Sequence, residues 1–411
     1  MMPDRSPSSG PAPLSPPAAA PLGVQERLDR LRLARSDGIG PITGRDLLAR
    51  FGSATAALAA LPDLTKKAGR NPIRACPPAK AEAEMAALDK LGARLLVIGD
   101  SDYPVALAAI EDAPLAITVK GHLDLLAQPQ IALVGARNAS ANGRKIAQDM
   151  ARELAAAGCV VVSGLARGID SAAHLGAFQA LDQAPECSGG TIAVIAGGID
   201  VLYPPENGPL FERIGQNGLV IAELAPGTEP LARYFPRRNR IIAGLSAAVV
   251  VVEAALKSGS LITARLALEQ GREVMAVPGS PLDPRCRGTN HLIREGALLV
   301  EEASQVLEAI GPSFHAPPSQ PAVPGGRTVN ISANPLKSPL ITSQAIENTD
   351  ESDEERARRA VLSQLGPSPV GVDELRRQCQ CSGPVLGMVL LELDLAGRLE
   401  RHPGNRVSLI A

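Results

Sequence analysis

The sequence of 411 residues contains no tryptophan, only five phenylalanines and only three tyrosines. Aromatic platforms for stacking nucleobases are therefore scarce, and a nucleic-acid binder of this composition must rely mainly on phosphate contacts. The formal net charge is -2, so no overall basic field attracts a polyanion. Any binding of DNA or RNA has to come from a local cluster of positive charge.

Metal, membrane and common catalytic signals are also missing. The six cysteines form no CxxC pair and have no histidine at zinc-finger spacing, which favours reduced thiols in a cytoplasmic protein without a metal or cofactor. No apolar run of about 18 residues and no N-terminal apolar segment after basic residues occurs, so we expect neither membrane insertion nor secretion. The phosphate loop GxxxxGK[ST], HExxH and GxSxG are absent, and we expect no enzymatic turnover.

Composition divides the chain into five segments. Residues 1–22 are rich in Pro, Ala and Ser without a period, which predicts a disordered tail. Residues 312–350, rich in Pro, Ser and Asn, indicate a flexible linker. Residues 23–92 have the pattern of a helical domain, residues 93–311 alternate strand and helix patterns, and residues 351–411 form a small terminal module.

Short apolar runs predict strands at residues 94–98, 131–134, 159–163, 192–196, 219–223, 248–252, 273–277 and 297–300. Helices of ordinary length fill most of the gaps, and the stretch after the first strand is expected to be rich in loops. This alternation predicts an α/β fold: a doubly wound, mostly parallel sheet with helices on both faces, as in an extended Rossmann-like core.

The flanking modules carry hypotheses of their own. In residues 31–52 two helical patterns meet at a Gly-Ile-Gly turn, which fits a helix-hairpin-helix (SAM-like) unit able to hold a phosphate, or a helical packing domain with a tight turn. Residues 351–411 predict three short helices and a two-stranded hairpin, the layout of a winged helix. Its third helix, residues 383–395, is mostly apolar and acidic, so contact with protein is favoured over reading of DNA bases.

Two turns at the ends of predicted strands combine small residues with an arginine. Residues 135–140 include Arg137 and end at Ser140, which can cap a helix. Residues 163–168 include Arg167 and lead to Asp170, a cap for the next helix. Each turn aims helix N-terminal N–H groups at the same edge of the sheet, so the pair suggests a phosphate site.

Three further turns are expected on the same rim, at residues 196–205, 235–240 and 253–263. The second opens a helix with three arginines, whose charge opposes the helix dipole unless a polyanion binds; a solvated surface turn is the alternative. The third offers Lys257 and Ser260 before another helix. Together these turns favour binding of phosphates.

Other ionisable residues near strand ends are expected to have structural roles. Glu223 and Glu253 end predicted strands and could act as acid or base, but they lack a partnered nucleophile. Holding arginines or backbone amides is therefore the favoured role. His174 lies in a predicted helix and is expected to pack rather than to act as a base.

The motifs in this order resemble the DprA (Smf) family of bacterial DNA-processing proteins. The resemblance is carried by VGARNAS at 134–140, SGLARGIDSAAH at 163–174, FPRRNRIIAGLS at 235–246, KSGSLITA at 257–264, VPG at 277–279 and GTNHLIREGA at 288–297. It covers about residues 100 to 300, and both flanking modules fit the layout of the family.

The resemblance implies a cytoplasmic homodimer that binds and protects single-stranded DNA without sequence preference and loads RecA recombinase during natural transformation. It assigns DNA contacts to Arg137 and to Arg167, where the family often has lysine; arginine keeps the charge and adds a bidentate fork. Gly135, Ser163 and Gly164 would let a phosphate approach the backbone. From the residues themselves we add further candidates for binding single-stranded DNA, namely Arg238, Arg240, Lys257 and Ser260.

Two alternatives stay open. The same sheet type resembles nucleotide phosphoribohydrolases of the lysine-decarboxylase-like group, whose motif is PGGxGTxxE. Here Gly279 is followed by Ser280, and Leu292 stands where that motif has its glutamate. A protein-interaction scaffold is the other alternative, but it would leave the turns that carry arginine without a purpose.

Overall fold

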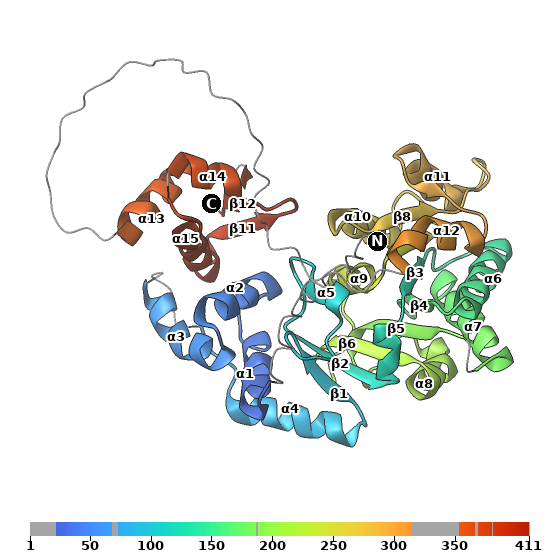
Figure 1. Ribbon diagram of the computed structural model, residues 1–411, viewed down its shortest axis with the longest axis horizontal. Coiled ribbons are helices and arrows are strands. Elements are labelled where there is room, and N and C mark those ends of the chain that lie inside the picture. The colour runs from blue at the N-terminus through green and yellow to red at the C-terminus, as the bar shows by residue number, and fades with distance from the viewer. Residues whose placement is uncertain are drawn as a thin grey trace, which may run out of the picture.

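The computed structural model describes residues 22–67, 73–185, 188–314, 353–365, 369–379 and 381–410. Figure 1 shows a group of N-terminal helices, a large α/β region and a C-terminal module. The expected tail and the expected linker lie almost wholly outside the described residues. The domain boundaries stay predictions, and α12 (Ala303–Phe314) continues into the stretch expected to be linker.

The α/β region is built on a nine-stranded sheet with the order β1-β2-β6-β5-β4-β3-β7-β8-β9. Strands β3 to β9 pair in parallel, whereas β2 is antiparallel to both β1 and β6. The strands are β1 (Arg94–Val97), β2 (Ala116–Gly121), β3 (Gln130–Val134), β4 (Val160–Ser163), β5 (Gly190–Gly198), β6 (Leu219–Leu224), β7 (Ala248–Val251), β8 (Glu273–Ala276) and β9 (Leu298–Leu299). The strand order reverses at β3, which lies between β4 and β7.

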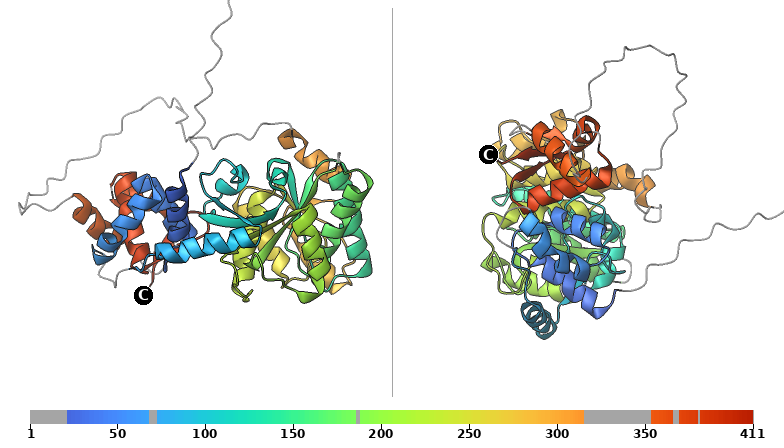
Figure 2. Two further views of the ribbon diagram at one scale, coloured as in Figure 1. Left: turned by 90° about the horizontal axis from the view of Figure 1, so that it is seen from below. Right: turned by 90° about the vertical axis from the view of Figure 1, so that its left-hand side faces the viewer.

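Helices cover both faces of the sheet, as Figure 2 shows. One face carries α6 (Ala141–Ala156), α7 (Ile169–Gln183), α8 (Gly208–Asn217) and α12, and the other carries α5 (Val105–Ala108), α9 (Tyr234–Leu245) and α10 (Gly259–Glu269). Helix α11 (Arg287–Arg294) packs beside β8. Because Val161 faces one core and Val160 the other, the strands need continuous apolar runs. The predicted α/β fold is confirmed.

One strand of the sheet was not predicted from the sequence. Strand β2 lies in the stretch expected to be rich in loops, directly after Pro114 and Leu115. Its residues from Ala116 to Val119 are buried, and they pair with β1 and β6. The other strands of the sheet lie where they were predicted, to within two residues at either end.

The N-terminal group consists of α1 (Val24–Ala34), α2 (Pro41–Phe51), α3 (Ala54–Lys67) and α4 (Pro78–Lys90). The turn between α1 and α2 requires glycine at residue 38, where φ is 76°. Arg35 fastens this group to the sheet: its guanidinium donates to the Glu84 carboxylate on α4 at 2.7 Å and to the Glu223 carbonyl oxygen at 3.2 Å. The helices are therefore anchored next to the α/β region.

The C-terminal module contains α13 (Asp353–Gln364), α14 (Val372–Cys379) and α15 (Gly383–Leu395), with β10 (Val370–Gly371), β11 (Leu399–His402) and β12 (Arg406–Leu409). Its sheet has the order β10-β12-β11, one strand more than the predicted two-stranded hairpin. The three helices and the hairpin confirm the winged-helix layout.

Helix α15 packs against α2 and α3, and Figures 1 and 2 show the two modules side by side. Leu391 and Leu395 are buried in one cluster with Leu47 of α2. At the edge of this contact Arg401 pairs with Asp46 at 2.8 Å. The third helix therefore contacts protein, as its apolar composition predicted, and the partner is the N-terminal part of the same chain.

Candidate nucleic-acid interface

A cavity of about 540 Å³ lies at the carboxyl ends of β3, β4, β7 and β8. We call it the rim cavity. It opens where the strand order reverses at β3, the position at which open α/β sheets usually bind their ligands. The residues that line it include Gly135, Arg137, Asp170, Phe235, Arg238, Lys257, Ser258, Ser260 and Arg285. Four of the five turns predicted to converge on one rim line this cavity, whereas the turn at residues 196–205 reaches only a smaller cavity beside it.

Arg137 and Phe235 form one wall of the rim cavity. The guanidinium carbon of Arg137 lies 4.8 Å from the centroid of the Phe235 ring, and Tyr203 meets that ring edge-on at 5.7 Å. A guanidinium stacked on an aromatic face keeps its N–H groups free for hydrogen bonds in its own plane. Within the described residues no carboxylate forms an ion pair with Arg137, so its charge is available to a ligand.

Arg167 lies beside the same aromatic pair. With Arg137, Tyr203 and Phe235 it lines a small cavity next to the rim cavity. Its side chain is 61% exposed and faces Glu206 at 3.4 Å, an exposed pair that contributes little and that a phosphate can displace. The structure therefore brings the two predicted arginines together around one phenylalanine.

The opposite wall is the N-terminus of α10. Lys257 is exposed and precedes Ser258, which caps the helix by accepting from the Ser260 N–H. The Ser260 hydroxyl is already shared with Ser258 at 2.7 Å. Lys257 is therefore free to reach a ligand, while Ser260 mainly orders the helix start. Arg285, beyond β8, also faces the cavity but pairs with Asp283 at 2.7 Å.

Some backbone amides of the first two turns donate to the protein's own carboxylates. Glu253 accepts from the Ser140 N–H at 2.9 Å, and Ser140 in turn caps α6. Asp170 accepts from the N–H groups of Gly164 and Ala166 at 3.2 and 3.3 Å. Carboxylates therefore occupy part of the expected anion site on these amides, and side chains are the main source of attraction for phosphates.

Asp170 differs from its expected role as a helix cap. The residue at the N-cap of α7 is Gly168, and the Asp170 carboxylate bonds back to its own turn. Burial raises the pKa of Asp170, although the Arg238 charge opposes that shift. The predicted structural roles of the two glutamates hold, because Glu253 binds a backbone amide and Glu223 binds the guanidinium of Arg240 at 2.6 Å.

The two inner arginines of α9 are parts of the scaffold. Arg238 is only 6% exposed, and it donates to the carbonyl oxygens of Gly164, at 2.6 Å, and Val194. Burial lowers the pKa of Arg238 to about 10. Arg240 is 4% exposed and is held by Glu223 and the Asp112 carbonyl oxygen. These acceptors resolve the conflict with the helix dipole without a polyanion, contrary to the reason for which both were proposed as ligands.

The small residues of the first two turns serve close packing. The Ser163 hydroxyl is buried and donates to the Leu133 carbonyl oxygen at 2.6 Å. A Cβ at Gly135 would lie 2.6 Å from Ile169, and one at Gly164 would lie 2.2 Å from the Arg238 guanidinium. Of these three residues, Gly135 lines the rim cavity and Gly164 the small cavity beside it.

Sequence reasoning missed Phe235 and Arg285 as residues of the cavity. Phe235 opens the FPRRNR motif, and in a chain so poor in aromatic residues its place beside several arginines was a usable signal. Arg285 follows β8, whose carboxyl end lies on the same rim. Both could have been found by searching the segments after each strand, including the first turn of the next helix, for aromatic and basic residues.

The described residues lack two kinds of site. They contain no cluster of histidine, cysteine, aspartate and glutamate that could hold a metal ion, and no helix long and apolar enough to cross a membrane. His174 is fully buried, with its Nδ1 2.6 Å from the Thr191 hydroxyl, and burial lowers its pKa to about 3. It packs as predicted, away from the rim cavity.

Fold and site together define a class: an α/β protein with a cationic cavity at the point of strand-order reversal, flanked by a helical and a winged-helix module. Family models match all three parts. Residues 94–311 match DNA recombination-mediator protein A, residues 24–87 the DprA-like N-terminal HHH domain, and residues 346–405 the DprA winged helix domain. The chain belongs to the DprA (Smf) family, as its motifs indicated.

Individual relatives agree with this assignment. The chain is 49% identical to the DNA processing protein DprA of Streptococcus pneumoniae over 51% of this chain and 71% of that protein. It is 38% identical to the protein Smf of Escherichia coli over 76% of this chain and 77% of that protein. The crystal structure of the Streptococcus pneumoniae protein superposes with a TM-score of 0.57 at 39% identity, covering 68% of this chain and 95% of that one.

Proposed function

We propose that this chain binds single-stranded DNA without sequence preference at the rim cavity. The observation that carries the proposal is the placement of Arg137 and Arg167 around the Phe235 ring. A single strand presents phosphates for the two guanidinium groups and unstacked bases for the ring, whereas a duplex hides its base faces. Every base has a face that can stack, so such a site tolerates any sequence.

The candidate site favours binding without turnover. The carboxylates of Glu223, Glu253 and Asp170 each hold a guanidinium or backbone amides. Leu292, at the position of the phosphoribohydrolase glutamate, packs against the apolar core. We therefore place the chain among DNA-binding mediators, and we keep hydrolysis of nucleotides as the alternative to be tested.

Membership of the family supports the wider role. The matching model describes a DNA recombination mediator, so we propose that the bound strand is protected and passed to RecA recombinase in natural transformation. We further propose that the chain acts as a cytoplasmic homodimer. The cysteines among the described residues are free thiols, which is compatible with a reducing compartment.

The proposal is tested by the fluorescence anisotropy of a labelled single strand and of the matching duplex, titrated with protein across a salt series. We expect tighter binding of the single strand, and a loss of about tenfold or more in the double variant Arg137→Ala plus Arg167→Ala. Removal of two phosphate contacts should also reduce the slope of log affinity against log salt by about 1.4.

The control is Arg94→Ala plus Arg265→Ala, which removes two exposed arginines that pair with carboxylates elsewhere on the surface. It should leave affinity and slope unchanged. Binding that is insensitive to the first double variant, or hydrolysis of nucleoside monophosphates by the wild type, would contradict the proposal.

A further inference from the structure

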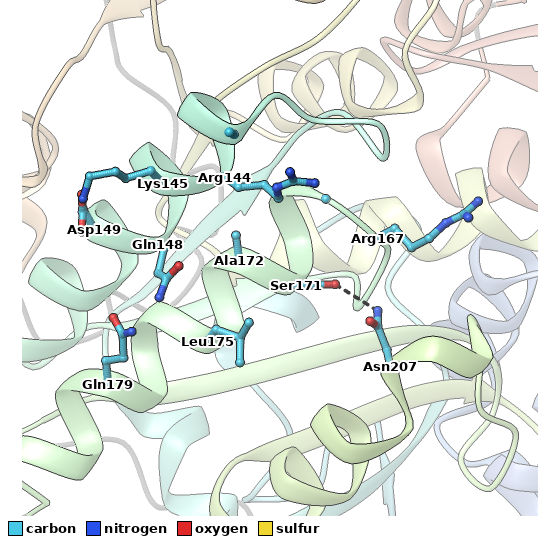
Figure 3. Close-up of a pocket in the computed structure, with 12 residues that line it drawn as sticks. Arg144, Lys145, Gln148, Asp149, Arg167, Ser171, Ala172, Leu175, Gln179 and Asn207 are labelled. Carbon is cyan, nitrogen blue, oxygen red and sulfur yellow. Dashed lines mark hydrogen bonds and ion pairs between the residues drawn. The ribbon is translucent and has the colours of Figure 1, made fainter.

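A second cavity, of about 690 Å³, lies in the groove between α6 and α7. We call it the helix groove. Arg144 and Gln148 are four residues apart on α6, and Leu175 and Gln179 are four residues apart on α7, so each pair lies on one face of its helix. Figure 3 shows the two glutamine amides facing each other across the groove.

The floor of the helix groove is fixed by a close contact of the two helices. A Cβ at Gly176 would lie 2.1 Å from the Gln148 carbonyl oxygen, so only glycine allows this approach. Ala172 is buried in the floor, whereas Leu175 is 43% exposed. The groove is therefore a formed feature of the fold that leaves an apolar side chain uncovered among polar ones.

Positive charge gathers at one end of the helix groove. Arg144 is exposed and has no ion pair with any described residue. Figure 3 shows its side chain extending toward the side on which Arg167 lies. Lys145 is bonded to Asp149 at 2.9 Å. Arg144 thus offers a guanidinium without an ion-pair partner. Arg167, whose ion pair with Glu206 is exposed, adds a second cation.

The helix groove continues the path of the rim cavity. Arg167 lines the helix groove and also the small cavity that Arg137 and Phe235 share. A strand with one base stacked on Phe235 and a phosphate at Arg167 would therefore pass directly to Arg144. Successive phosphates of a strand are bound by successive cationic side chains. The edges of the bases can form hydrogen bonds with the donors and acceptors of side-chain amides.

We propose that the helix groove binds further nucleotides of the strand held at the rim cavity, with Arg144 on a phosphate and Gln148 and Gln179 beside the bases. Leu175 provides an apolar contact for a base. This inference rests on the proposed function and adds a second subsite to it. The polar walls and the uncommitted cation favour a nucleic acid over a protein segment as the occupant.

The test compares oligothymidylates of about 5 and about 20 nucleotides, chosen to span the usual site sizes of single-strand binders. Arg144→Gln should weaken binding of the long oligonucleotide about fivefold and reduce its salt slope by about 0.7. Binding of the short one, which can occupy the rim cavity without reaching Arg144, should fall less than binding of the long one. Leu175→Glu should show the same larger effect on the long oligonucleotide, because it places a negative charge in the groove.

The matched control is Arg94→Gln, an exposed arginine on β1, which should change neither oligonucleotide. Wild-type protein that binds neither oligonucleotide would contradict the proposed function itself. Wild-type protein that binds both, together with an Arg144→Gln variant of unchanged affinity and slope, would overturn the proposal for the helix groove alone.

Discussion

Four arginines near the rim cavity fall into two regions with opposite properties. Arg137 and Arg167, in the turns after β3 and β4, are exposed and lie around Phe235. Arg238 and Arg240, inside α9, are buried and hydrogen-bonded to protein oxygens. A positive residue near a cavity is thus a candidate ligand only while its N–H groups are uncommitted.

The buried arginines have a function of their own, which is to hold the cavity in shape. The Gly164 carbonyl oxygen and the Val194 carbonyl oxygen, which Arg238 joins, belong to the turn after β4 and to β5. Arg238 therefore fixes the loop that carries Arg167 relative to the sheet. In the proposed function, Arg238 thus supports the turn from which Arg167 would contact a strand.

The largest expected difference between the buried and the exposed arginines is in their contribution to the stability of the fold. Arg238→Met keeps the length of the side chain but leaves two buried carbonyl oxygens without their donor and Asp170 without a nearby cation. We expect the free energy of unfolding to fall by about 3 kcal/mol or more, measured by urea denaturation. Arg137→Met, the exposed counterpart, should change it by no more than about 0.5 kcal/mol. Equal losses in the two variants would remove the distinction.

A second prediction uses the pH dependence of the buried region. Burial lowers the pKa of His174 to about 3, whereas in the unfolded chain it is about 6.5. Between about pH 6.5 and about pH 3 the unfolded state therefore binds a proton that the folded state does not bind. The free energy of unfolding decreases as the pH falls through this range. Between about pH 7 and about pH 5 this one residue should cost about 2 kcal/mol.

In His174→Asn the loss between the same two pH values should be smaller than in the wild type by that amount, measured by urea denaturation at each pH. His291→Asn makes the same substitution at a partly exposed histidine of α11 and serves as the matched variant. An unchanged slope in His174→Asn would show that the histidine takes up a proton in the folded state.

The comparison also explains what could be predicted from the sequence. Buried strands are recognisable in the sequence as apolar runs. The strands of the sheet could therefore be predicted, except for β2 beside Pro114. The roles of Arg238 and Arg240 could not be found, because their acceptors are backbone oxygens and Glu223, distant in sequence. Likewise, the sequence of the turns does not show that Glu253 and Asp170 accept from the amides of Ser140 and Gly164.

The smallest expected effect is on DNA binding by the exposed arginines. It distinguishes the contribution of the positive charge from that of the guanidinium shape. Arg137→Lys keeps the positive charge, so the salt slope of binding to single-stranded DNA should not change. Lysine lacks the planar fork and stacks less well on Phe235, so we expect affinity to fall only about two- to fivefold, measured by anisotropy against the loss in Arg137→Ala. A loss as large as that of the alanine variant would mean that the guanidinium geometry, rather than the charge, determines binding at this position. Lysine at Arg167, which has no ring contact of this kind among the described residues, should be tolerated still better.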